Sequence, residues 1–147
     1  MEVTYNDPIF GEMKYKHRWY KIEKIHFFNK EWQITVAAKA YLGKPITDQQ
    51  RESYFSFKEN EDEIVATITE MIVNYVNENC EELSSTWIGA RMISSSTDLA
   101  DITIPKTLLF TQSGELLVLF DCAWDVEHGL AVQVFPEYKI GSQDCFL

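Results

Sequence analysis

Alternation of apolar and polar residues marks the first strong element of the chain. In the stretch WQITVAAKAY, residues 32–41, one side of an extended chain would carry Trp32, Ile34, Val36, Ala38 and Ala40. A repeat of two residues is the period of a β-strand with one buried face. The preceding RWYKIEKIHFF is rich in aromatic and β-branched residues, and the polar residues 29–31 suit a turn. We therefore predict an N-terminal antiparallel hairpin, with a short extended segment around residues 12–15 before it.

A helix is predicted after this hairpin. Thr47 is followed three residues later by Gln50, which is the side-chain pair of a capping box. The pair predicts a short helix from about Asp48 to Lys58. The aromatic composition of residues 54–57 is also compatible with a third strand, and this is the alternative.

The next helix has the stronger pattern. Asn60 is a suitable N-cap, and the three acidic residues 61–63 are favourably placed against the helix dipole. Apolar residues then recur every three or four positions, at Ile64, Ile68, Met71, Ile72 and Tyr75. This stripe predicts a helix over about residues 61–80 that packs one face against a sheet.

Apolar runs at residues 102–111 and 115–123 predict two strands joined by a turn at Gly114, and residues 130–135 and 139–141 predict two more. Residues 84–101 between the helices and these strands read as a loop. The order of strands, helices and strands predicts an α+β fold: a mainly antiparallel sheet, built from the N-terminal hairpin and a C-terminal meander, with two helices on one face. The 147 residues, of which 46% are hydrophobic, suit a single domain over residues 1–147.

The net charge of the chain indicates which kinds of molecule the protein is expected to bind. Thirteen basic and 23 acidic residues give a net charge of −10 and a pI near 4.7. Binding to phosphates requires clustered Lys and Arg, so we expect neither a nucleic acid nor an anionic membrane as partner. An acidic surface speeds encounter with a basic protein, or it only keeps the molecule in solution. The sequence shows no signal peptide and no membrane-spanning segment, so we expect a cytoplasmic protein.

Candidate chemistry is concentrated in DCAWDVEHGLAV, residues 121–132. We interpret this stretch as a structural turn between two strands, formed by Trp124, Asp125, Glu127, His128 and Gly129. One alternative is Cys122 as a nucleophile with His128 as its base. The other is a small hydrolase or metal-dependent enzyme that uses Asp125, Glu127 and His128 as ligands.

We favour the structural turn and expect no catalytic residue, metal or cofactor. A cysteine after the apolar LLVLF run is expected to be buried, without the positive neighbours that activate a thiol. The metal set lacks the paired spacings of strong metal motifs. The three cysteines, Cys80, Cys122 and Cys145, form no C-x-x-C pair and are expected to be free thiols.

The motifs W-D-x-E-H-G-L at residues 124–130 and G-x-Q-D at residues 141–144 resemble the C-terminal signature of an uncharacterised bacterial domain family. Residues 7–11, 46–50 and 57–64 also fit the general pattern of that family. Its members resemble small proteins of polymorphic-toxin and contact-dependent growth inhibition loci. The resemblance implies an immunity protein, which binds a cognate toxin domain and neutralises it.

An acidic surface would suit such a role because toxin domains that attack nucleic acids are themselves basic. The candidate partner-binding residues are Glu59, Glu61, Asp62, Glu78, Glu81, Glu82 and Trp87. Glu81 and Glu82 lie at the helix end where negative charge is unfavourable, so helix stability does not explain them. The alternatives are a solvated helix surface for the carboxylates and core packing for Trp87.

Overall fold

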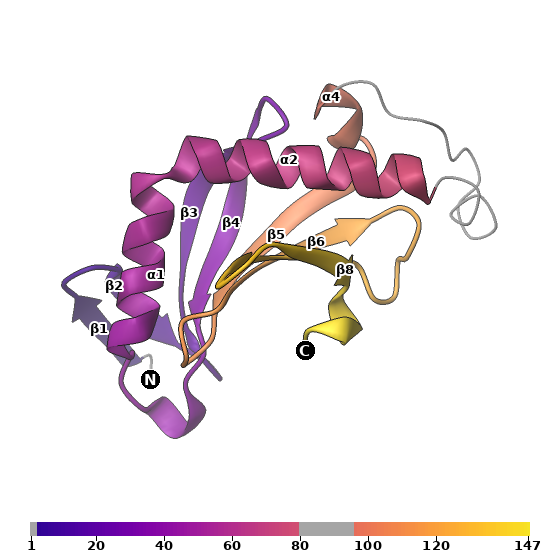
Figure 1. Ribbon diagram of the computed structural model, residues 1–147. Coiled ribbons are helices and arrows are strands. Elements are labelled where there is room, and N and C mark those ends of the chain that lie inside the picture. Colours follow the sequence, from indigo (N-terminus) through magenta and orange to yellow (C-terminus); the bar gives the residue numbers. More distant parts are fainter. Residues whose placement is uncertain (1–2, 80–95) are drawn as a thin grey trace.

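The computed structural model describes residues 3–79 and 96–147, which form one eight-stranded sheet and the helices that cover it (Figure 1). The strands are β1 (Val3–Asp7), β2 (Gly11–Tyr15), β3 (Trp19–Phe27), β4 (Lys30–Ala38), β5 (Thr103–Phe110), β6 (Leu116–Cys122), β7 (Leu130–Phe135) and β8 (Lys139–Ser142). The α-helices are α1 (Asp48–Glu59), α2 (Glu61–Glu78) and α4 (Ser96–Leu99), and the 3₁₀ helices are η1 (Tyr41–Gly43) and η2 (Gln143–Cys145). The α+β class is thereby confirmed.

The strands lie in the sheet in chain order, from β1 to β8. Every neighbouring pair is antiparallel except β4 and β5, which run parallel with Thr35 opposite Thr107 and Ala38 opposite Phe110. A parallel pair needs a long crossover, and here α1 and α2 provide it. The predicted N-terminal hairpin and C-terminal meander are therefore two antiparallel units joined at β4 and β5.

The capping box at the start of α1 forms as predicted. The Thr47 side chain accepts from the Gln50 backbone N–H at 3.2 Å, and the Gln50 side chain accepts from the Thr47 N–H at 2.9 Å. Gln50 is buried, and its amide nitrogen donates to the carbonyls of Lys39 and Phe110. It thus links α1 to the adjoining ends of β4 and β5. The alternative of a strand at residues 54–57 is wrong.

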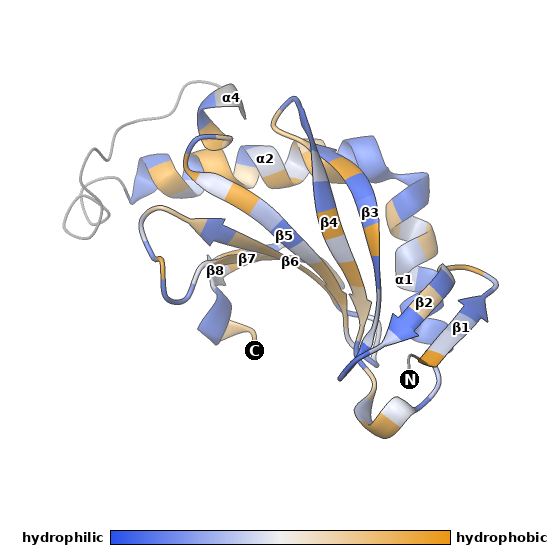
Figure 2. Ribbon diagram, turned by 180° about the vertical axis from the view of Figure 1, so that it is seen from behind, coloured by the Kyte–Doolittle hydropathy of each residue, from blue (hydrophilic) through white to orange (hydrophobic). Residues whose placement is uncertain are grey.

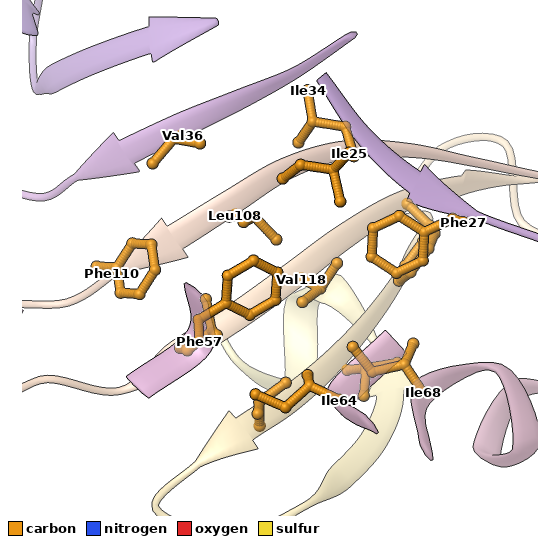
Figure 3. Packing of buried hydrophobic residues seen from close by; sticks show 14 of the residues in the cluster. Ile25, Phe27, Ile34, Val36, Phe57, Ile64, Ile68, Leu108, Phe110 and Val118 are labelled. Atoms are coloured by element: carbon orange, nitrogen blue, oxygen red, sulfur yellow. The ribbon is translucent and has the colours of Figure 1, made fainter. Parts of the chain in front are cut away.

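The apolar stripe of α2 faces the sheet. Ile64, Ile68, Ile72 and Val76 are buried, and Figure 3 shows Ile64 and Ile68 among side chains from the sheet such as Phe27 and Val118. Full burial of such a side chain contributes about 2 kcal/mol. The predicted capping by Asn60 is wrong in one respect: its side chain donates to the Ser56 carbonyl at 3.0 Å rather than accepting from α2. Asn60 also ends α1, and this earlier helix holds its side chain.

The turn between β3 and β4 is shorter than predicted. Phe28 and Asn29 alone make it, with φ angles of 56° and 62°, while residues 30 and 31 already belong to β4. Two successive left-handed residues fit the twist of a two-residue hairpin. The first strand of the sheet, β1, was not predicted.

The face of the sheet opposite the two long helices is also partly apolar. Ala37, Leu109 and Leu117 are buried there, and Phe146 packs against them. Figure 2 shows this side of the curved sheet, with the C-terminal segment beneath β7 and β8. None of the described helices is both long and apolar enough to cross a membrane.

Candidate functional site

The predicted structural turn connects β6 and β7. The Asp125 carbonyl accepts from the Gly129 N–H at 2.8 Å, and its carboxylate accepts from the His128 backbone N–H at 3.0 Å. The His128 ring nitrogen Nδ1 lies 3.1 Å from the same carboxylate oxygen. Gly129 has a φ of +69°, the left-handed conformation that glycine adopts without strain. Asp125 thus forms hydrogen bonds with backbone and side-chain groups of the same turn.

The two C-terminal motifs meet in space at Gln143. Its side-chain amide donates to the carbonyl of Phe120 at 2.9 Å and contacts that of Leu130 at 3.4 Å. A Cβ atom on Gly129 would lie only 2.6 Å from Gln143 Nε2 and 2.5 Å from the Phe120 oxygen. The glycine of the first motif is thus needed for the glutamine of the second to reach the strands. Sequence reasoning grouped the motifs but did not find this contact.

Carboxylates surround the imidazole of the turn. The hydrogen bond to Asp125 raises the pKa of His128, and the negative charges of Asp125, Asp144 and Glu127 add to the effect. In turn, a hydrogen bond from Ser142 lowers the pKa of Asp144, and the charge of His128 contributes in the same direction. His128 is exposed. The turn is therefore an acidic surface feature whose carboxylates favour the protonated form of His128.

The Cys122 thiol is not activated. It is buried, and its Sγ lies 3.7 Å from the Asp125 carbonyl oxygen. Burial raises the pKa of Cys122 to about 11, which leaves almost no thiolate near neutral pH. Cys145 is exposed, and Cys80 lies outside the described residues. Within residues 3–79 and 96–147, no three His, Cys, Asp or Glu side chains are grouped to hold a metal ion.

The candidate binding residues of α2 are mostly exposed. Over its 18 residues, α2 contains five acidic residues and no basic one. Asp62 and Glu78 are exposed, as is Glu59 just before the helix. Glu61 differs, because Lys58 donates to its carboxylate at 2.9 Å. Glu81, Glu82 and Trp87 lie in residues 80–95, outside the described part of the chain.

The C-terminal end of α2 lies beside the turn at residues 124–129, which we call the signature turn. The rings of Tyr75 and Trp124 are 6.3 Å apart, and the Ala123 N–H donates to the Ile102 carbonyl at 2.9 Å. In Figure 1, α2 runs from its corner with α1 toward α4 and the β6–β7 connection. Exposed carboxylates lie on α2 and on the two segments beside its C-terminal end, and we define the acidic surface as Asp62, Glu63, Glu70, Glu78, Asp101 and Glu127.

The charge is divided unequally along the chain. Residues 1–58 contain ten basic residues (Lys and Arg) and seven acidic residues (Asp and Glu). Residues 59–147 contain three basic and sixteen acidic residues. The net charge of −10 therefore arises entirely from the second part, which carries the acidic surface. This division is visible in the sequence and was missed because the charge was counted over the whole chain. Glu70 and Asp101 were missed for a different reason, since neither stands next to another acidic residue in the sequence.

Comparison with known proteins places this fold in a family. Residues 9–147 match a domain of unknown function, DUF6985. No curated protein and no solved structure matches the chain significantly. Because the match covers nearly all of the sequence, the chain belongs to the DUF6985 family.

Proposed function

We propose that this protein is an immunity protein, which binds a cognate basic toxin domain in the cytoplasm and neutralises it through the acidic surface. The observation that carries the proposal is the concentration of negative charge on α2 and beside the signature turn, without a basic residue in α2. The resemblance of the two C-terminal motifs to proteins of toxin loci supplies the class of partner.

The physics of association favours a basic partner. A surface of one charge sign steers an oppositely charged protein and can raise the association rate by an order of magnitude or more at low salt. A nuclease toxin must present cations to the phosphates of its substrate. An acidic protein that covers those cations would block the substrate directly. The partner's own chemistry need not be encoded in its inhibitor, since specificity comes from the fit of the two surfaces.

The test begins with co-expression of the tagged protein and the product of the adjacent gene. Native mass spectrometry with metals retained should give a one-to-one complex, and the association rate should fall steeply as salt increases. Glu78→Lys with Glu127→Lys should weaken binding, and so should Glu81→Lys with Glu82→Lys. The matched control is Glu12→Lys with Glu52→Lys, two exposed carboxylates outside the acidic surface. Equal weakening by all three pairs would show that total charge, rather than this surface, matters.

The alternative is a small hydrolase or metal-dependent enzyme at Asp125, Glu127 and His128. It is less well supported, because the Asp125 carboxylate is already engaged by the turn's own backbone and by His128. The same mass measurement separates the two proposals. Stoichiometric metal without a protein partner, and its loss in His128→Ala, would favour the enzyme.

A further inference from the structure

A groove lies between α2 and the tip of the β3–β4 hairpin. Figure 1 shows this tip rising beside the helix. The groove has a volume of about 590 Å³ and is lined by His26, Phe28, Asn29, Asp62, Val65, Ala66, Thr69 and Glu70. Three of the eight lining residues are apolar, Phe28, Val65 and Ala66, and two carboxylates lie on the helix side. Sequence reasoning had assigned only Asp62 of these residues to partner binding.

The hairpin wall of this groove is held in a fixed conformation. Phe28 has a φ of 56°, which is unfavourable for a bulky residue. Its ring is 3% exposed and lies 5.8 Å from the Phe27 ring and 6.2 Å from the Phe120 ring. Burial among these rings offsets the backbone strain. The groove is therefore preformed, which lowers the entropic cost of filling it.

The two carboxylates are available to a ligand. Asp62 and Glu70 are exposed, and neither forms an ion pair within the described residues. They are eight positions apart on the helix, which is about 12 Å along its axis. Between them the helix presents Val65, Ala66 and Thr69 to the groove. An apolar strip with a negative charge at each end suits a segment with an apolar side chain between two cations.

We propose that this groove receives a basic segment of the partner, with Lys or Arg at both ends and an apolar side chain on the floor between them. In an extended segment, residues four apart span about 13 Å, which matches the spacing of the carboxylates. Arginine suits the ends because its guanidinium binds a carboxylate through two parallel hydrogen bonds. The inference rests on the proposed function, and it adds where the partner binds and which side chains it supplies.

The first test fills the groove without changing charge. Ala66→Trp should raise the Kd of the complex with the adjacent-gene product by about tenfold or more, which is the effect of blocking a central contact. Gln33→Trp adds the same side chain at an exposed position of β4, outside both the groove and the acidic surface, and should change the Kd by less than about twofold. Asp62→Lys with Glu70→Lys should weaken binding more than the control Glu12→Lys with Glu52→Lys. Circular dichroism and urea unfolding would check that each variant is folded.

The second test does not depend on the toxin. A capped peptide Arg-Ala-Leu-Ala-Arg is titrated into the isotope-labelled protein, and the amide signals of residues 62–70 should shift in the wild type but not in Ala66→Trp. If Ala66→Trp forms the complex normally and the peptide causes no shifts, the groove is not the binding site for a basic segment, and the proposed function is unaffected. If the wild-type protein forms no complex, the proposed function is wrong. The peptide titration alone then tests whether the groove binds a basic segment. Shifts of residues 62–70 that occur in the wild type and are lost in Ala66→Trp support binding in the groove. Shifts at other residues only, or no shifts, refute it.

Discussion

Gly129 and Gln143 are matched to each other: the missing side chain of the glycine leaves the space that the glutamine amide occupies. A Cβ at residue 129 would lie 2.6 Å from Gln143 Nε2, which is too close for unbonded atoms. The amide uses that position to donate to the carbonyls of Phe120 and Leu130. The contact connects the signature turn to the C-terminal 3₁₀ helix, 14 residues further along the chain.

Gly129→Ala should therefore destabilise the fold by about 3 kcal/mol, because it adds a clash with the Phe120 oxygen to the strain of a positive φ. Gly129→Val should cost more. The matched control is Gly11→Ala, where φ is +83° but no atom lies within 4 Å of the new Cβ. This control should lose only about 1 kcal/mol, and urea unfolding would measure both. Equal losses at the two sites would mean that neither the Phe120 oxygen nor Gln143 constrains residue 129.

Asp7 joins the first hairpin to α1. Its buried carboxylate accepts from the N–H groups of Ile9 and Phe10 at 3.0 and 2.9 Å, and from Arg51 Nε at 2.7 Å. Asp7→Ala should lower the free energy of unfolding by about 3 kcal/mol, because three polar groups lose their acceptor. Asp48 carries the other carboxylate bound to Arg51, and its side chain is 91% exposed. Asp48→Ala should therefore lower the free energy of unfolding by less than about 1 kcal/mol. Similar losses from both variants would contradict the central role of Asp7.

Glu23 should make stability depend on pH in the acidic range. Burial acts to raise its pKa, but hydrogen bonds from Lys58 and Tyr54 and the charges of Lys58 and Lys21 outweigh burial, so the pKa is lowered from 4.5. A lowered folded-state pKa means that the unfolded state binds more protons. The stabilisation is present above pH 4.5 and is lost as pH falls through the folded-state pKa. Glu23→Gln should therefore flatten the decline of unfolding free energy below about pH 5. A profile parallel to that of the wild type would refute this assignment.

His128 should titrate above its ordinary pKa of 6.5, chiefly because Asp125 accepts its hydrogen bond. A raised folded-state pKa stabilises the turn fully below pH 6.5, and this contribution disappears as pH rises through the folded-state value. Asp125→Asn should bring the pKa back toward 6.5, with a smaller decrease for Asp144→Asn. Proton NMR of the imidazole would follow all three titrations. No change in Asp125→Asn would show that the contact does not persist in solution.

Cys122 should be inert in the folded protein. Its pKa of about 11 and its burial both oppose alkylation, whereas Cys145 is exposed. In a Cys80→Ser variant at pH 8, iodoacetamide should label Cys145 alone, and denaturation should expose both thiols. Peptide mass mapping would assign the label. Rapid labelling of native Cys122 would return attention to a nucleophile beside the signature turn.

Local signals in the sequence determined the elements of this protein. Thr47 and Gln50 started α1, the stripe of isoleucines oriented α2, and Gly129 marked the turn between two strands. Each signal acts over a few residues, through hydrogen bonds of the cap, the period of the helix or the φ angle of one residue. The same signals were enough to assign the α+β class and to interpret Asp125 and His128 as parts of a turn.

Only the tertiary structure decided which of these elements meet. The pairing of β4 with β5 joins strands that both helices separate in sequence, and no local pattern specifies its parallel direction. The contact of Gln143 with Phe120, and the groove that brings Phe28 to α2, arise in the same way. Such contacts depend on the shapes and charges of surfaces that become neighbours only when the sheet assembles. The sequence therefore determined how much acidic charge the protein carries and which part of it lies on one helix, and the fold decided that this helix borders a preformed groove.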